Sequence, residues 1–303
     1  MAGHVSEPVA PDRRYDYSPI TARPAGVWPG GARLAVYVAI GVESYRFGDG
    51  HTEDLLPGVD APDMVNASWR DYGNRVGAFR LLERLERLAM PATILLNTDV
   101  YDTAPAVTDA ARLSGAEIVG HGLSNSDSLA GRDRDDERAY LDAVAARIEA
   151  GEGHRPGGWS SPWLTHTPRT PDLLAAAGYR YLLDLRLDDQ PVWLNVEGPP
   201  LLAIPYALEL NDSSSIIGRG VSAPDFAGMI IDEFDELMDA TTGQPLVMSI
   251  VVHSFISGVP FRLRQLTRAL EHLAARRDEV WFAQPGHIHA AFAAMAPPGP
   301  GAG

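Results

Sequence analysis

The 303-residue sequence contains neither cysteine nor lysine, and both absences limit its chemistry. Without cysteine, thiol catalysis, disulfide bonds and thiolate zinc sites are excluded, so any metal ion would need His, Asp, Glu or Asn ligands. Without lysine, there is no Schiff-base nucleophile, no pyridoxal-phosphate anchor and no phosphate-binding Gly-Lys-Ser/Thr loop. A kinase lysine is excluded for the same reason.

Positive charge and long hydrophobic runs are also scarce. The 25 basic residues, all of them arginine, face 40 acidic residues, which gives a net charge of −15. An acidic surface argues against binding to nucleic acid or anionic lipid, so we expect a small-molecule substrate. No run approaches 18 apolar residues, and the amino terminus lacks the basic and apolar regions of a signal peptide. The sequence therefore predicts a cytoplasmic protein without a membrane segment.

The chain divides into three parts by composition. Residues 1–27 are rich in Pro, Arg and Asp and are predicted to form an arm or tail. Residues 294–303 are rich in Pro and Gly and are predicted to be a disordered tail. Residues 28–293 contain no repeat, linker or break in composition, so they are predicted to form one domain.

Short apolar runs alternate with amphipathic helical stretches along this domain. Such alternation predicts a parallel sheet, closed or nearly closed, with helices outside it. The predicted strands are 33–41, 92–96, 117–119, 158–159, 179–183, 201–206, 246–252 and 280–282. The predicted helices are 76–88, 108–114, 135–150, 170–177, 225–239 and 261–275.

Four predicted strands run into polar side chains. In β/α barrels the reactive residues gather where strands end and loops begin. An unpaired charge at the end of a buried strand is costly, so Glu43, His121 and His253 are predicted to be functional. The four segments are Gly41-Val42-Glu43-Ser44, Gly120-His121-Gly122-Leu123-Ser124-Asn125, Trp159-Ser160-Ser161-Pro162-Trp163 and Val251-Val252-His253-Ser254.

In this order, the segments resemble the polysaccharide deacetylase superfamily, and within it the intracellular branch of metal-independent allantoinase and cyclic imide hydrolases. The resemblance runs from Trp28 to about His289, and its most specific part is similar to the segment that leads into the first helix of that branch. It implies an α/β fold, a distorted (β/α) barrel of about seven strands, hydrolysis of carbon-nitrogen bonds other than peptide bonds, and a homo-oligomer. The matching segments are 69–82, 117–122, 204–206, 211–212 and 280–283.

The sequence departs from the sugar deacetylases of this superfamily at three places. Where those enzymes place paired aspartates, this chain has Glu43 and Ser44, and the second histidine of their His-x-x-x-His motif is replaced by Asn125. The arginine expected in their third motif is absent from residues 160–163. These changes favour the imide and ureide branch.

Hydrolysis of an amide or imide needs an activated water, a proton donor for the leaving nitrogen and a group that stabilises the oxyanion. Glu43 is the candidate general base. His121 and His253 could each donate a proton or bind a metal. Together with Glu43 they form a ligand set that suits one divalent metal, zinc above all, with a position open for water. A carboxylate such as Asp127 or Asp188 would then have to act as the base.

Four further residues are candidates for substrate binding. Tyr72 and Arg75 follow the first strand, and the planar guanidinium of arginine suits an imide or ureide carbonyl or a carboxylate product. Asn125 can pair with the edge of a cyclic imide, and Trp163 can stack on a flat ring.

The main prediction is a hydrolase of a small cyclic imide or ureide, in which Glu43 or a bound metal promotes attack by water. One alternative is a metal-dependent deacetylase of an N-acetylated sugar or other N-acyl compound, with a role in carbohydrate metabolism. Another is an inactive relative that binds a small molecule. The inactive relative would be favoured if Glu43, His121 and His253 did not lie in one pocket.

Overall fold

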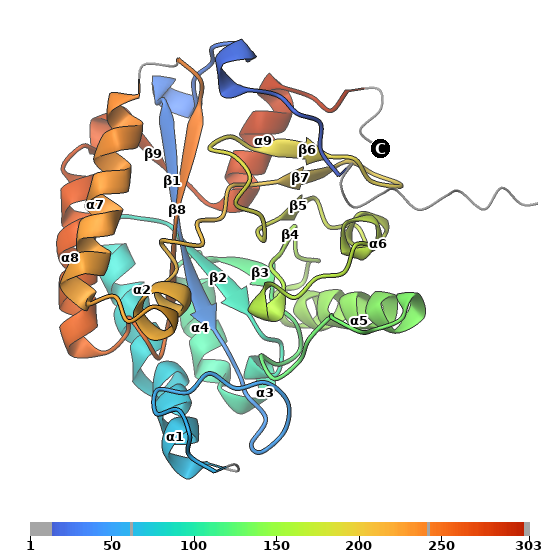
Figure 1. Ribbon diagram of the computed structural model, residues 1–303, viewed down its shortest axis with the longest axis vertical. Helices are drawn as coiled ribbons and strands as arrows, with labels where there is room; N and C mark the ends of the chain where they lie inside the picture. Colours follow the sequence, from blue (N-terminus) through green and yellow to red (C-terminus); the bar gives the residue numbers. More distant parts are fainter. Residues whose placement is uncertain (1–13, 61–62, 241–242, 300–303) are drawn as a thin grey trace, which may run out of the picture.

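The computed structural model describes residues 14–60, 63–240 and 243–299 (Figure 1). These residues form one sheet of nine strands in the order β6-β7-β5-β4-β3-β2-β1-β8, and β9 also pairs with β1. The neighbouring strands of the described residues pair in parallel, except β6 with β7. The strands are β1 Leu34–Val42, β2 Ala92–Leu96, β3 Glu117–Gly120, β4 Gly158–Trp159, β5 Tyr181–Leu182, β6 Val192–Leu194, β7 Leu201–Ala203, β8 Leu246–His253 and β9 Val280–Phe282.

Strand β1 is the central element of the sheet, and all nine of its residues are buried. One edge pairs with β8 from Leu34 to Gly41, while the other edge pairs with β9 near its start and with β2 near its end. Side chains alternate along a strand, so β1 contributes to two cores. Leu34, Val36 and Ile40 lie in one hydrophobic cluster, and Tyr37 lies in the other.

Helices cover the outside of the curved sheet, and the long pair α7 and α8 lies together on the side of β8 (Figure 1). Burial of both faces explains why the strands read as continuous apolar runs rather than as alternating ones. The helices are α1 Met64–Tyr72, α2 Ala78–Arg87, α3 Val100–Thr103, α4 Pro105–Leu113, α5 Arg134–Glu152, α6 Thr170–Ala176, α7 Ala223–Asp239, α8 Pro260–Ala274 and α9 Pro285–Met295.

The predicted α/β fold, a distorted (β/α) barrel, is confirmed, with two corrections. The sheet has nine strands in the described residues rather than about seven, and the strand missing from the predicted set is the short antiparallel β6. Helices α1, α3 and α9 were not predicted, since none has a long apolar stripe. None of the described helices is both long and apolar enough to cross a membrane.

The two chain ends pack further onto the barrel than their composition predicts. Arg14, which is buried, forms an ion pair of 2.6 Å with Asp172 at the start of α6. Residues 14–27 therefore form an arm that contacts the domain, whereas residues 1–13 lie outside the described part. The predicted boundary at residue 293 falls inside α9, which continues to Met295.

A close backbone contact fixes the segment that follows β8. A π-helical turn, Gly73–Gly77, lies between α1 and α2. A Cβ atom on Gly77 would lie 1.9 Å from the backbone oxygen of Ser254 and 3.3 Å from the Cα of Gly258. Only a residue without a side chain permits this approach.

We expect Gly77→Ala to destabilise the protein by about 1–3 kcal/mol, because backbone atoms must move apart to admit the methyl group. Gly228→Ala in α7 is the matched control, since its Cβ would meet nothing within 4 Å. That change should stabilise the helix by about 0.5–1 kcal/mol. Urea unfolding curves would measure both values, and equal stability of the two variants would contradict the assignment.

Candidate active site

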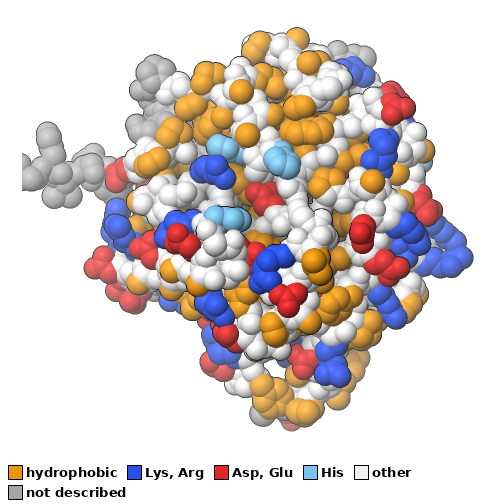
Figure 2. Space-filling model, turned by 180° about the vertical axis from the view of Figure 1, so that it is seen from behind, with side chains coloured by type: hydrophobic (Ala, Val, Ile, Leu, Met, Phe, Trp, Pro, Cys, Tyr) orange, Lys and Arg blue, Asp and Glu red, His pale blue; other side chains and the backbone are white. Residues whose placement is uncertain are grey.

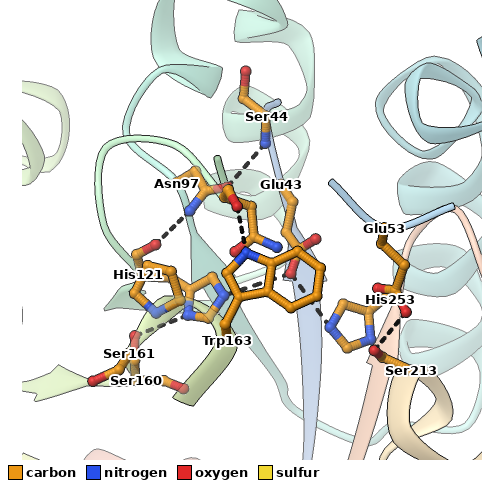
Figure 3. Close-up of polar contacts among 12 residues, drawn as sticks. Glu43, Ser44, Glu53, Asn97, His121, Ser160, Ser161, Trp163, Ser213 and His253 are labelled. Atoms are coloured by element: carbon orange, nitrogen blue, oxygen red, sulfur yellow. Dashed lines mark hydrogen bonds and ion pairs between the residues drawn. The ribbon is translucent and has the colours of Figure 1, made fainter. Parts of the chain in front are cut away.

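Three strands of the sheet bring the predicted catalytic residues to one edge. Glu43 follows β1 directly, His121 follows β3, and His253 is the last residue of β8. Parallel strands end at the same edge, so residues far apart in the sequence meet there. The Oε1 atom of Glu43 lies 3.5 Å from Nε2 of His121 and 3.3 Å from Nε2 of His253 (Figure 3).

The other ring nitrogen of each histidine is held by a fixed partner. Nδ1 of His121 lies 2.8 Å from the backbone oxygen of Ser160, which can only accept, so this nitrogen carries a proton. Nδ1 of His253 lies 2.6 Å from Asp212, whose carboxylate also accepts from the backbone N–H of His253 and from the hydroxyl of Ser257. Both rings therefore direct Nε2 toward Glu43.

The buried charges in this cluster stabilise one another. Burial alone would raise the pKa of the Glu43 carboxyl, but the charge of His253 and hydrogen bonds from both histidines hold it well below its usual range. Burial alone would lower the pKa of His253, but the charges of Glu43 and Asp212 raise it well above its usual value. At neutral pH the site thus holds a Glu43 carboxylate beside a His253 imidazolium.

A cavity of about 220 Å³ lies over these groups. It contains all three predicted catalytic residues and two of the predicted binding residues, Asn125 and Trp163. The face of the molecule turned away from the viewer in Figure 1 carries acidic and basic side chains interspersed with hydrophobic ones (Figure 2). The complete lining is Glu43, Glu53, His121, Asn125, Ser161, Trp163, Leu164, Tyr206, Asn211, Ser213, Ser214 and His253.

Asn125 and Trp163 are linked in the wall of this cavity. The indole N–H of Trp163 donates to the backbone oxygen of Asn125 at 2.6 Å, and the Asn125 amide donates to the hydroxyl of Tyr45 at 2.8 Å. Trp163 has a φ of 57°, a left-handed conformation that non-glycine residues rarely adopt. The buried Oδ1 of Asn125 has no hydrogen-bond partner among the described residues. An acceptor is therefore available there for a substrate N–H group.

Tyr72 and Arg75, which were predicted to bind substrate, do not line the cavity. Tyr72 ends α1 and is half-buried beside Arg80, which donates to its hydroxyl. Arg75 is exposed on the π-helical turn. Gly73, two residues before it, packs against the segment after β8, since a Cβ there would lie 2.4 Å from Oγ of Ser254.

The two carboxylates considered as substitute bases are engaged elsewhere. Asp127 accepts from the hydroxyl of Tyr140 at 2.9 Å and pairs with Arg46. Asp188 pairs with Arg23 of the amino-terminal arm at 2.5 Å. Neither residue lines the cavity, so neither is placed to act as a base there.

Two site residues had no role in the sequence analysis. Asp212 supports His253. Asp212 lies in segment 211–212, one of the segments that resemble the superfamily, and this was the sequence signal that could have identified it. Glu53 lies in the long segment between β1 and α1, which has no periodicity that places it in the fold. Burial raises the pKa of its carboxyl to about 7.

The predicted zinc ligands are not arranged as a metal site. No group of three or more His, Asp or Glu side chains in residues 14–60, 63–240 and 243–299 is arranged to hold a metal ion. The raised pKa of His253 opposes metal binding, because a metal ion would have to displace the proton on Nε2. Asn125, which replaces a second histidine, donates to Tyr45 instead.

No family model matches the chain. The structure of Puue allantoinase superposes with a TM-score of 0.80 and 26% identity, covering 91% of this chain and 96% of that one. A Pseudomonas aeruginosa PAO1 protein described as a "probable Polysaccharide deacetylase" superposes with a TM-score of 0.79 and 27% identity over the same shares. The peptidoglycan deacetylase of Helicobacter pylori is 25% identical over 260 residues, 74% of this chain and 86% of its own.

The chain is thus similar over most of its length to proteins named as polysaccharide deacetylases and to an allantoinase. The predicted resemblance is therefore confirmed, and the allantoinase lies among its structural neighbours. Deacetylases and allantoinases hydrolyse carbon-nitrogen bonds other than peptide bonds, so the predicted enzyme class is confirmed at the level of the superfamily.

Proposed function

We propose that the protein hydrolyses a carbon-nitrogen bond of a small cyclic imide or ureide, with Glu43 as general base and His253 as general acid. The observation that carries this proposal is the buried Glu43 carboxylate, whose Oε1 contacts both imidazoles while Asp212 supports the second of them. A base and an acid in opposite protonation states at neutral pH are what ring opening by water requires.

In this mechanism, Glu43 accepts a proton from a water molecule whose oxygen attacks a ring carbonyl. The new C–O bond gives a tetrahedral intermediate, and cleavage of the C–N bond opens the ring. His253 donates its Nε2 proton to the leaving nitrogen, and the products are an amide nitrogen and a carboxylic acid on one chain. Because Oε1 of Glu43 lies 3.3 Å from Nε2 of His253, the proton can return directly and reset both groups.

The cavity supports a small, flat substrate. Its volume of about 220 Å³ is below the range of about 300–1,000 Å³ that is typical of pockets for drug-sized ligands. Trp163, which is 36% exposed, offers a flat surface for a ring, and the free Oδ1 of Asn125 can accept a ring N–H. A sugar chain would need an open groove instead.

The test measures hydrolysis of succinimide, hydantoin, allantoin and an N-acetylated sugar, before and after chelation, together with elemental analysis of the protein. We expect ring opening without bound metal, and no loss of activity in chelator. Activity on the N-acetylated sugar alone, or activity that chelation abolishes and zinc restores, would overturn the proposal.

One specific observation favours a second candidate, deacetylation of an N-acyl compound, since a relative covered over 86% of its length is named a peptidoglycan deacetylase. The chelation experiment separates this candidate from ring opening. An inactive binding relative is disfavoured, because Glu43, His121 and His253 lie in one cavity. The homo-oligomer implied by the resemblance stays a prediction.

A further inference from the structure

The segment between β1 and α1 is held over the cavity at two places. At Gly50, where φ is 72°, a Cβ atom would lie 2.2 Å from the backbone oxygen of Ser126, and that oxygen also accepts from the backbone N–H of His51 at 3.0 Å. Beyond this point, the buried Arg70 of α1 donates to the backbone oxygen of Glu53 at 2.8 Å. The backbone on both sides of the Glu53 side chain is therefore fixed.

The Glu53 carboxyl forms part of the cavity wall and is only 8% exposed. Its Oε1 accepts from the hydroxyl of Ser213 at 2.7 Å (Figure 3). No hydrogen bond or ion pair joins Oε2 to any residue in the described part of the chain. Oε2 is not one of the enclosed side-chain atoms that lack a partner, so it is open to the cavity, where it can accept a hydrogen bond from a ligand.

Glu53 and Asn125 come from different segments of the cavity wall. In Figure 3, Glu53 lies beside His253 and Ser213, on the far side of Trp163 from His121. Asn125 belongs to the loop after His121 and holds Trp163. Both residues thus offer an acceptor, Oε2 of Glu53 and Oδ1 of Asn125, to one enclosed volume.

We propose that Glu53 is a specificity-determining residue that accepts a hydrogen bond from a second N–H group of the substrate, away from the bond that is cleaved. This inference rests on the proposed ring-opening function. It defines the preferred substrate as a cyclic ureide with N–H donors on two sides of the ring, one for Asn125 and one for Glu53. An imide with a single N–H would satisfy only one of the two acceptors.

The ionisation of Glu53 agrees with this role. Burial raises the pKa of its carboxyl to about 7, and the nearby positive charge of His253 counteracts part of that increase. The carboxylate form is therefore available near neutral pH as an acceptor, and a donor from the substrate would stabilise it.

Hydantoin and succinimide form a matched pair for the test, because hydantoin has an N–H where succinimide has a CH₂ in a ring of the same size. We expect a higher kcat/KM for hydantoin. In Glu53→Gln, the Ser213 hydroxyl holds the amide oxygen, so the amide NH₂ faces the cavity and opposes a substrate N–H. The ratio of kcat/KM for hydantoin to that for succinimide should fall at least tenfold.

The matched control is Glu86→Gln, which removes the same charge from an exposed position on α2 and should leave the ratio unchanged. If Glu53 had a purely structural role, its replacement would lower kcat/KM for hydantoin and for succinimide by the same factor. An unchanged ratio in folded Glu53→Gln would therefore overturn the inference. If that variant does not fold, Ser213→Ala is tested instead. Without the Ser213 hydroxyl, Oε1 of Glu53 loses the partner that positions the carboxylate, so the ratio of the two kcat/KM values should also fall. If the native enzyme opens neither ring, the proposed function fails, and this inference with it.

Discussion

Glu43→Gln should lower kcat/KM for ring opening by about 10²–10⁴-fold, the contribution typical of a general base. The amide cannot accept a proton from water at neutral pH, although it occupies nearly the same space as the carboxylate. Glu43 accepts a hydrogen bond from the hydroxyl of Tyr45 at 2.6 Å and contacts both imidazoles, so its carboxylate is held in a fixed position. Steady-state kinetics on hydantoin and circular dichroism of the variant would measure the loss and check the fold.

Glu117→Gln is a suitable control for this experiment, because Glu117 is also a buried glutamate. Its carboxylate accepts from the hydroxyl of Tyr181 at 2.6 Å and from the backbone N–H of Gly286 at 2.9 Å, away from the cavity. We expect this change to lower thermal stability but not kcat/KM. Full activity in Glu43→Gln would eliminate Glu43 as the base.

Asp212→Asn should lower kcat by about 10²–10⁴-fold and move the alkaline limb of the pH-rate profile to lower pH. Burial alone would lower the pKa of His253, and the charges of Glu43 and Asp212 overcome this effect and raise it. Without the Asp212 charge, the pKa of His253 falls. A general acid must be protonated, so activity is lost as pH rises through that pKa, and a lower pKa brings the loss to lower pH.

The measurement is a pH profile of kcat for the native enzyme and for Asp212→Asn. Asp235→Asn provides the control, because Asp235 lies 2.9 Å from Nε2 of His272 in a half-exposed pair on the surface. That pair should contribute little, as is typical of exposed ion pairs. An alkaline limb that stays in place in Asp212→Asn would show that His253 is not the acid.

The strands and the three central side chains could be predicted because one physical rule governs both. Strand β1 is buried on both faces, which gives the continuous apolar run that identifies it, and the same is true of β8. A charged or imidazole side chain directly after such a run is conspicuous. Since parallel strands end at one edge, Glu43, His121 and His253 were expected to meet.

That Tyr72 and Arg75 lie outside the cavity could not be predicted from their position along the chain alone. The turn after α1 packs against the segment after β8 through Gly73 and Gly77, which have no side chains. Arg75 lies two residues from each of them and is exposed to solvent. The backbone of the turn, rather than the arginine side chain, makes the close contact, and the polarity of the sequence does not reveal this.

Glu53 illustrates a different limit of sequence reasoning. Its place depends on Gly50 contacting Ser126 and on Arg70 holding the backbone, contacts between residues that are separate in the sequence. A loop without periodicity gives no direction for its side chains, so a buried acid there resembles a solvated one. Only the three-dimensional arrangement shows that Glu53 faces Ser213 in the cavity.

The pairing of β1 with β8 also has a consequence for synthesis of the protein on the ribosome. The first strand emerges early, but its long edge from Leu34 to Gly41 has no partner until β8 has been made. At about 5–20 residues per second, the roughly 200 intervening residues take on the order of 10–40 s. During that interval the nascent chain exposes an apolar strand edge, a surface that chaperones bind.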